Sequence, residues 1–274
     1  MSPNPPVRPA VRVTLAQVVT SSDATANRAV VDDVFSLAAR ARADLLVLPE
    51  YASAFDPAGV GPDLAEPLDG PFVSGLRARA AATGIAVIAG TTAPGADPRR
   101  AVNTVVAVDG SGTLVGTYRK VHLYDAFGFR ESDRLEPGPV DAPSLVLALH
   151  GLRFGVMTCY DLRFPESARR LVDAGANVLV VPAAWASGEL KDLHWRTLAM
   201  ARAIENTCAV VGVGQAGSGV IGHSIVVGPD GVVGLEMDDR PAVRTVDLDP
   251  VQLGAVREAN PSLSNRRYAV VPRP

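Results

Sequence analysis

The sequence predicts an α/β fold in which two mixed sheets pack together and helices cover their outer faces. Up to Gly90, apolar runs of strand length alternate with helical patterns in the order β, α, β, α, β. From Val102 onward, short strands joined by turns are interleaved with further helices. Crossover units indicate parallel strand pairs and hairpins indicate antiparallel ones, so their combination is typical of mixed sheets.

The first part of the chain is expected to alternate strands and helices. Its predicted elements are a strand at 11–18, a helix ending at about Ala43, a strand at 44–50, a helix at about 71–83 and a strand at 85–90. A Ser-Ser-Asp cluster at 21–23 offers N-caps to the first helix. Consecutive apolar residues in the second strand indicate that both of its faces are covered, and Pro49 ends it, which leaves Glu50 at its carboxyl edge.

The remaining elements include two hairpins. They are strands at 103–108 and 113–118, strands at 145–149 and up to Cys159, a helix at 165–174, a strand at 177–182, a helix at about 190–206, a strand that Cys208 opens, strands around 221–227 and 243–246, and a short helix at 249–257. No repeat, charge run or linker divides them. We therefore expect one domain over residues 11–274, after a disordered tail at 1–10 that lacks the apolar core of a signal peptide.

Composition excludes several classes of protein. The chain has 274 residues, is 47% hydrophobic and carries a net charge of −3, whereas a nucleic-acid-binding protein normally shows a basic patch. Its longest apolar runs have the length of strands, which argues against a membrane partner. Two cysteines cannot form a disulfide framework, so a cytoplasmic location is expected.

Residues 154–166 read as a strand, a turn and the start of a helix. Pro165 and Glu166 suit a first helical turn, which places Cys159 on the connection. A thiol there can reach into a cleft while backbone N–H groups nearby point outward to stabilise an oxyanion. The alternative is a buried structural cysteine, which is the interpretation we give to Cys208 in its apolar strand.

Three ionisable residues end predicted strands: Glu50, Lys120 and Cys159. If these ends converge, the site holds a thiol, a carboxylate to take its proton, and an ammonium to stabilise negative charge on a substrate oxygen. Each residue alone is weak support, because a charge at a strand end is usually solvated or half of a surface ion pair. Their combination favours a nucleophilic enzyme.

The segments around these residues resemble the three motifs of the nitrilase superfamily, the carbon-nitrogen hydrolases with a Glu-Lys-Cys triad. They are Leu-Leu-Val-Leu-Pro-Glu at 45–50, Tyr-Arg-Lys-Val-His-Leu at 118–123 and Gly-Val-Met-Thr-Cys-Tyr-Asp-Leu-Arg-Phe-Pro-Glu at 155–166. The resemblance runs from Val11 to about Val271. It implies a four-layer αββα sandwich that pairs with a second copy, hence a homodimer or larger homo-oligomer.

The resemblance also implies roles for individual residues. Cys159 is the expected nucleophile, Glu50 the general base, and Lys120 with the backbone N–H of Tyr160 the oxyanion stabiliser. Attack on a carbonyl or nitrile carbon releases ammonia or an amine and leaves a thioester, which water activated by Glu50 hydrolyses. No metal or organic cofactor is implied. Glu131 resembles the family's second glutamate, which positions substrate and base, although it could be an ordinary loop carboxylate.

Residues 159–166 are most similar to those of omega-amidases and deaminated-glutathione amidases, which cut a terminal amide from a small carboxylate-bearing substrate. Arg163 could fork onto that carboxylate, or could instead be a structural arginine paired with Glu166 or Glu205. Trp185 could fill part of the pocket or belong to the core. The loop at 184–195 differs from those amidases, and the connection from Lys120 to Glu131 looks shorter.

Other functions remain open from the sequence. The same triad serves N-carbamoyl amino-acid hydrolases and nitrilases, and an oligomeric binding protein could keep the fold without catalysis. The glycine pattern at 212–217 matches a dinucleotide fingerprint, but a strand pattern follows where that motif requires a helix. The four histidines lack the spacing of metal ligands, so each is expected to be structural.

Overall fold

The computed structural model describes residues 10–273, so residues 1–9 of the predicted disordered tail lie outside the described residues. The strands are β1 Val11–Gln17, β2 Leu45–Val47, β3 Ala86–Pro94, β4 Ala101–Val108, β5 Leu114–Arg119, β6 Val146–Leu149, β7 Leu152–Val156, β8 Val178–Ala183, β9 Ala209–Gly214, β10 Ile225–Val227, β11 Val233–Glu236 and β12 Ala242–Leu248. The helices are α1 Ala24–Arg40, α2 Pro71–Thr83, α3 Pro165–Asp173, α4 Lys191–Asn206 and α5 Pro250–Ala259.

These strands form two six-stranded mixed sheets. The first has the strand order β12-β1-β2-β3-β4-β5, and the second has the order β11-β10-β9-β8-β7-β6. In each sheet three neighbouring strands are parallel, β1-β2-β3 in one and β7-β8-β9 in the other, and the remaining pairs are antiparallel. The predicted combination of crossover units and hairpins is confirmed.

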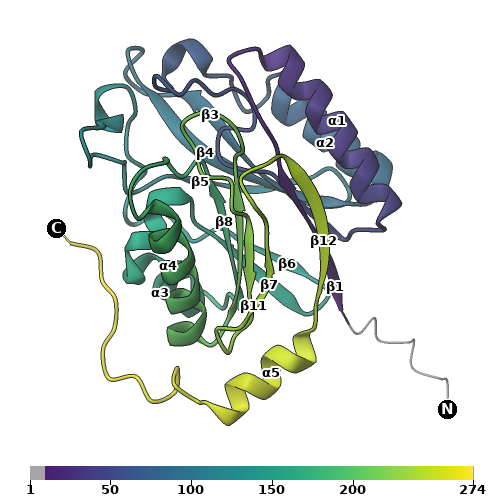
Figure 1. Cartoon of the computed structure of the whole chain (residues 1–274), viewed down its shortest axis with the longest axis vertical. Helices are drawn as coiled ribbons and strands as arrows, with labels where there is room; N and C mark the ends of the chain where they lie inside the picture. The colour runs from purple at the N-terminus through teal and green to yellow at the C-terminus, as the bar shows by residue number, and fades with distance from the viewer. Residues whose placement is uncertain (1–9, 274) are drawn as a thin grey trace.

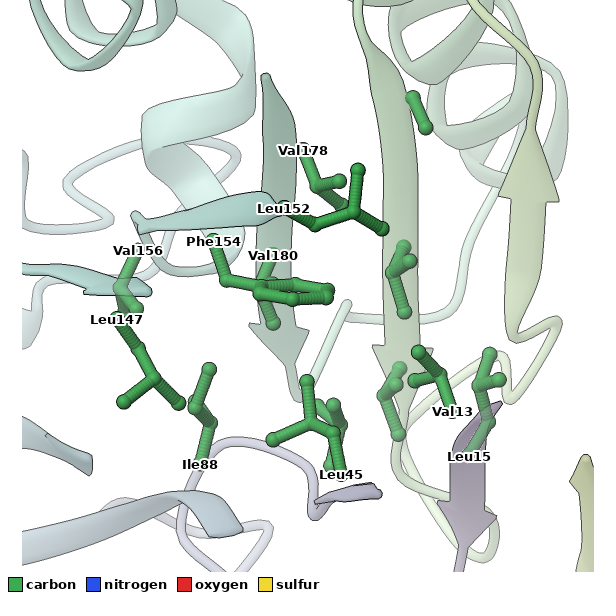
Figure 2. Close-up of a cluster of buried hydrophobic side chains, with 14 of the residues drawn as sticks. Val13, Leu15, Leu45, Ile88, Leu147, Leu152, Phe154, Val156, Val178 and Val180 are labelled. Atoms are coloured by element: carbon green, nitrogen blue, oxygen red, sulfur yellow. The ribbon is translucent and has the colours of Figure 1, made fainter. Parts of the chain in front are cut away.

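The two sheets face one another and the helices cover their outer faces, which confirms the predicted αββα sandwich. Figure 1 shows α1 and α2 on one side of the strands and α3 and α4 on the opposite side. Between the sheets lies an apolar core whose side chains include Val13, Leu45, Phe154 and Val180 (Figure 2). Two further buried apolar clusters join each sheet to its own helix pair.

Local signals account for the helix ends. Asp23 accepts hydrogen bonds from the backbone N–H groups of Thr25 and Ala26, as expected of an N-cap. The first helix stops at Arg40, earlier than the predicted Ala43, because the chain turns into the left-handed region at Arg42, where φ is 55°. The second helix spans 71–83 as predicted, with proline at its first position and a left-handed glycine after its last.

Strand β11 and the short 3-10 helices Pro62–Leu64, Glu131–Asp133 and Cys159–Arg163 were not predicted. Strand β11 has four residues, of which alternate ones are exposed, so it gives only a weak apolar pattern. The residues Cys159–Arg163 form a short 3-10 helix between β7 and α3, where the sequence indicated only a connection. Strand β2 is also shorter than predicted, since it ends at Val47 and the chain reaches Glu50 in irregular conformation.

The chain segments that follow β2, β5, β7 and β8 meet at one end of the sandwich. A hydrogen bond from the Ala184 backbone N–H, just after β8, to the Glu50 carboxylate, after β2, joins the two sheets at this point. Within residues 10–273, no helix combines the length and apolarity that a membrane crossing requires.

Candidate active site

The Glu50 side chain is buried and fully bonded beyond the end of β2. Its Oε1 accepts hydrogen bonds from Lys120 Nζ at 3.0 Å and from Asn103 Nδ2 at 2.6 Å. Its Oε2 accepts the Ala184 backbone N–H at 2.6 Å. The carboxylate is 1% exposed, so these donors replace the water that would otherwise solvate it.

Lys120 follows β5 and lies between two carboxylates. Its Nζ is 3.0 Å from Glu50 Oε1 and 2.8 Å from Glu131 Oε2, and the side chain is 1% exposed. Burial acts to lower the pKa of Lys120, but the charges of Glu131 and Glu50 outweigh it and raise that pKa well above its usual range. The ammonium therefore stays charged, and the predicted juxtaposition of Glu50 and Lys120 is present.

Glu131 belongs to the same charge cluster and is not a free loop carboxylate. It begins a short 3-10 helix, Glu131–Asp133, and both of its oxygens lie within 3.0 Å of Lys120 Nζ. Oε1 also accepts the hydroxyl of Tyr51 at 3.0 Å, and Oε2 accepts the backbone N–H of Tyr124 at 2.7 Å. These bonds fix a second carboxylate beside the ammonium.

Cys159 lies at the turn between β7 and α3, as the sequence predicts. Its φ of 46° is in the left-handed region, which a non-glycine residue occupies only when its surroundings enforce it. The residue is 8% exposed. Burial, together with the negative charge of Glu50, raises the pKa of the thiol well above its usual range, although Lys120 acts to lower it. The resting thiol is accordingly neutral at physiological pH.

Asp161 fixes this turn, and the sequence analysis did not single it out. Its fully buried carboxylate accepts the Thr158 backbone N–H at 3.0 Å and the Tyr118 hydroxyl at 2.7 Å. The backbone N–H of His122 and the ring Nδ1 of the same residue also reach it, at 3.2 and 2.7 Å. The network joins Tyr118 and His122, two positions before and two positions after Lys120, to Thr158, the residue before Cys159.

A small pocket opens beside the thiol and encloses about 30 Å³, room for little more than water. It brings together five of the predicted site residues with others, and its lining consists of Tyr124, Glu131, Cys159, Tyr160, Arg163, Ala184, Trp185, Ala186 and Lys191. Glu50 and Lys120 lie behind this lining, in contact with Glu131 and Ala184.

Arg163 lines the pocket and pairs with neither of the acids proposed as structural partners. Its guanidinium stacks over the Trp185 ring at 4.9 Å, and its Nη2 is 3.4 Å from His194 Nδ1. Its Nε is buried without a hydrogen-bond partner. Glu205 is instead bonded to Arg202 at 3.1 Å. Within residues 10–273 the pocket side of Arg163 is thus not neutralised by a carboxylate.

Trp185 serves the pocket and the core at once. Its ring packs against Trp195, with ring centroids 5.2 Å apart, and its Nε1 donates to the Lys191 carbonyl at 3.1 Å. The same ring forms part of the pocket lining. Trp185 therefore both lines the pocket and packs in the core, the two positions that the sequence left open.

Lys191 is a pocket residue that the sequence analysis missed. Its side chain is buried, and its Nζ donates to the Tyr124 hydroxyl at 2.6 Å and lies 3.7 Å from the centroid of the Phe127 ring. One signal could have found it. The chain contains 24 arginines but only two lysines, and both lysines lie at this site.

The structure offers other places for a ligand, but they lack this chemistry. A cavity of about 590 Å³ lies between α3 and residues 269–273, and none of Glu50, Lys120 and Cys159 lines it. In the described part of the chain, no three His, Cys, Asp or Glu side chains are grouped so as to hold a metal ion. Cys208 is fully buried in the core, and burial raises its pKa to about 12.

Comparisons with known proteins identify the family. The family model for carbon-nitrogen hydrolases matches residues 12–258. The deaminated glutathione amidase of Escherichia coli O157:H7 is 39% identical over 245 residues, which cover 89% of this chain and 92% of that protein. The solved structures similar to this one include Saccharomyces cerevisiae Nit3 and an amidase from Nesterenkonia sp. AN1. Saccharomyces cerevisiae Nit3, a member of branch 10 of the nitrilase superfamily, has a TM-score of 0.83 at 28% identity and covers 97% of this chain and 100% of its own.

The second is an amidase from Nesterenkonia sp. AN1, with a TM-score of 0.77 at 28% identity over 96% of this chain and 99% of that one; its active-site cysteine carries the covalently added acetamide moiety of fluoroacetamide. Sequence and fold agree along nearly the whole chain. The protein is therefore an amidase-type hydrolase of the carbon-nitrogen hydrolase family, within the nitrilase superfamily.

Proposed function

We propose that this enzyme hydrolyses the terminal amide of a small carboxylate-bearing molecule through a thioester on Cys159, with release of ammonia. The observation that carries the proposal is the buried cluster of Glu50, Lys120 and Glu131 next to a thiol held in a strained turn. Burying three charged groups costs free energy of folding, and such buried charge clusters are found preferentially at functional sites.

Glu50 acts first as the general base. Because the resting thiol is neutral, its proton moves to Glu50 as the sulfur attacks the amide carbon, and the C–S bond forms as the carbonyl π bond opens. Negative charge develops on the carbonyl oxygen. Lys120, which its two carboxylates keep charged, and the backbone N–H of Tyr160 stabilise this oxyanion.

The tetrahedral intermediate then collapses. The carbonyl reforms, the C–N bond breaks, and the proton held by Glu50 passes to the leaving nitrogen, so that ammonia departs and a thioester remains. Glu50 next removes a proton from water, which attacks the thioester through a second oxyanion. The carboxylic acid leaves and Cys159 regains its proton. Glu131, on the pocket wall, keeps Lys120 in place through the hydrogen bonds of its two oxygens to Nζ.

The carboxylate specificity rests on Arg163. A pocket cation without an acidic partner suits a substrate carboxylate, which a guanidinium binds through two parallel hydrogen bonds. The similarity of this chain to a deaminated glutathione amidase supports a substrate of this class. Because the pocket encloses only about 30 Å³, side chains of its wall must move aside to admit such a molecule.

We also propose that the protein acts in the cytoplasm and pairs with a second copy of itself. The outer helix α4 supports the pairing, since Leu193 and Ile204 are 57% and 49% exposed and lie eleven residues, about three helical turns, apart. They therefore form an apolar stripe on one helix face, which a partner surface would cover.

The decisive experiment is ammonia release from a panel of omega-amides of dicarboxylic acids, N-carbamoyl amino acids and simple nitriles. We expect the omega-amides to be consumed fastest, Cys159→Ala to lose turnover altogether, and Cys208→Ala to retain it because Cys208 lies far inside the core. Faster turnover of carbamoyl compounds would instead assign the enzyme as an N-carbamoyl amino-acid hydrolase, and faster turnover of nitriles as a nitrilase. Turnover by Cys159→Ala equal to that of the wild type would exclude the thioester mechanism, and an inactive wild type would favour a binding protein.

A further inference from the structure

The chain uses lysine only where the site lies. All but two of its 26 basic residues other than histidine are arginine, and the lysines are Lys120 and Lys191. Lys120 is neutralised by two carboxylates, whereas the Lys191 ammonium, 6% exposed, meets within residues 10–273 the Tyr124 hydroxyl and the rings of Tyr124 and Phe127 but no carboxylate. Lysine is almost never buried without an ion-pair partner, so an ammonium in this setting calls for an anion.

Arg163 also lacks a carboxylate partner in the described part of the chain. Its guanidinium lies 5.8 Å from the centroid of the Phe127 ring that Lys191 also contacts, and both side chains line the pocket of Cys159. Burial, and after it the positive charge of Arg163, lowers the pKa of Lys191, because both disfavour the charged ammonium. In residues 10–273, no acidic side chain forms an ion pair with either cation.

The carboxylate that lines the pocket already has hydrogen-bond donors of its own. Glu131 lines the same pocket, but its oxygens accept hydrogen bonds from Lys120, Tyr51 and the Tyr124 backbone N–H. It therefore does not neutralise Lys191 or Arg163. Two like charges held beside one aromatic ring repel each other unless an anion joins them. Since no acidic side chain of residues 10–273 pairs with either cation, a bound ligand is the expected source of this anion.

We propose that Lys191 is the second half of a carboxylate clamp, in which its ammonium and the Arg163 guanidinium bind the same carboxylate of the substrate. This rests on the proposed function and adds a specificity-determining residue to it. One carboxylate is expected because both cations border one small pocket and one ring. The Tyr124 hydroxyl aims the ammonium, since the 2.6 Å bond leaves its other two protons for the ligand. The substrate is then a short omega-amide with its amide at Cys159 and its carboxylate at the clamp.

The two lysines make the clamp directly observable by NMR. In Cys159→Ala protein labelled with ¹³Cε,¹⁵Nζ-lysine, two lysine side-chain signals are present, and Lys191→Met identifies one by its loss. Succinamate and butyramide are matched probes, because butyramide has a methyl group where succinamate has its carboxylate. We expect succinamate to shift the Lys191 signal strongly and butyramide to leave it in place. Succinamate that binds without moving this signal, or does not bind, would overturn the clamp.

Kinetics separate the clamp from the catalytic proposal. In Lys191→Met, kcat/KM for succinamate should fall about 10- to 100-fold, the loss expected for one charged hydrogen bond, mainly through KM. Turnover of butyramide should stay within about twofold, and Lys191→Arg should recover most of the succinamate activity. Equal losses on both substrates would mean that Lys191 is structural, while the thioester mechanism would still stand. Loss confined to succinamate supports the clamp.

Discussion

Asp161 takes no direct part in the chemistry proposed for Cys159, yet its carboxylate holds the turn that carries the cysteine. Four donors from β5, from the segment after it and from the residue before Cys159 converge on it. The strained φ of Cys159 persists because this network fixes the backbone on either side. A buried acid two residues from the nucleophile is thus a positioning residue.

Replacing Asp161 with asparagine tests this role. The amide offers one acceptor oxygen and brings two donors, so at least one of the N–H or O–H groups now bonded to the carboxylate loses its acceptor. We expect the free energy of unfolding to fall by about 1–3 kcal/mol and kcat to fall at least about tenfold, with a smaller change in KM. Urea unfolding and steady-state kinetics provide both values.

Glu166→Gln is the matched control, because it neutralises a nearby acid that lies outside the network. It should change neither quantity appreciably. A variant of Asp161 that unfolds more easily but keeps the wild-type kcat would show that the network stabilises the fold without positioning the thiol.

Strand β3 meets the site where Gly90 lies directly against the Glu50 backbone. A Cβ atom at position 90 would lie 2.5 Å from the Glu50 Cα and 2.8 Å from the Tyr51 nitrogen, closer than real Cβ atoms approach such atoms. The neighbouring atoms are backbone, which cannot rotate away. Glycine here permits the close approach of two chain segments.

We therefore expect Gly90→Ala to displace Glu50 and to lower both activity and stability. The unfolding free energy should drop by about 1–3 kcal/mol, as overpacking of a core usually costs, and kcat/KM should fall at least about tenfold. Gly254→Ala is the control, since a Cβ there meets open space inside helix α5 and should add about 0.5–1 kcal/mol of stability. Wild-type activity in Gly90→Ala would show that Glu50 tolerates movement of its backbone.

Sequence patterns predicted the elements that have strong local signals. The helix at 71–83 was placed correctly because proline and glycine mark its ends, whereas β11 was missed because its alternation is short and half exposed. Glu50, Lys120 and Cys159 could be named from strand ends and motif resemblance. Asp161 and Lys191 were not named, because the contacts of Asp161 with His122 and of Lys191 with Tyr124 span 39 and 67 positions, which local patterns do not encode. The signals that the sequence did offer were the Thr158–Asp161 capping box and the scarcity of lysine.

The whole molecule builds its site from both sheets. Glu50 and Lys120 follow strands of the first sheet, Cys159 and Ala184 follow strands of the second, and the Ala184-to-Glu50 hydrogen bond joins them. The packing of Phe154 and its neighbours between the sheets thus sets the distance between base and nucleophile (Figure 2). The outer helices cover the sheets, and in the proposed homodimer they contact the second copy.

Light scattering after gel filtration tests the pairing. We expect a mass near twice 28.5 kDa for the wild type. Leu193→Glu places a charge on the apolar stripe of α4 and should give a monomer, since burying an unpaired carboxylate in an interface is costly. Leu37→Glu, on the outer face of α1, where the leucine is 38% exposed, should leave the mass unchanged. A monomeric wild type would contradict the proposed pairing.

The scarcity of lysine also governs how the protein meets amine-directed reagents. Lys120 is 1% exposed and ion-paired, and Lys191 is 6% exposed, so acylating or aldehyde reagents find neither side chain readily. The positive charge of the surface is carried by guanidinium groups, which such reagents leave unmodified. Amine-directed labelling should accordingly leave the pocket, and with it the turnover of the enzyme, unchanged.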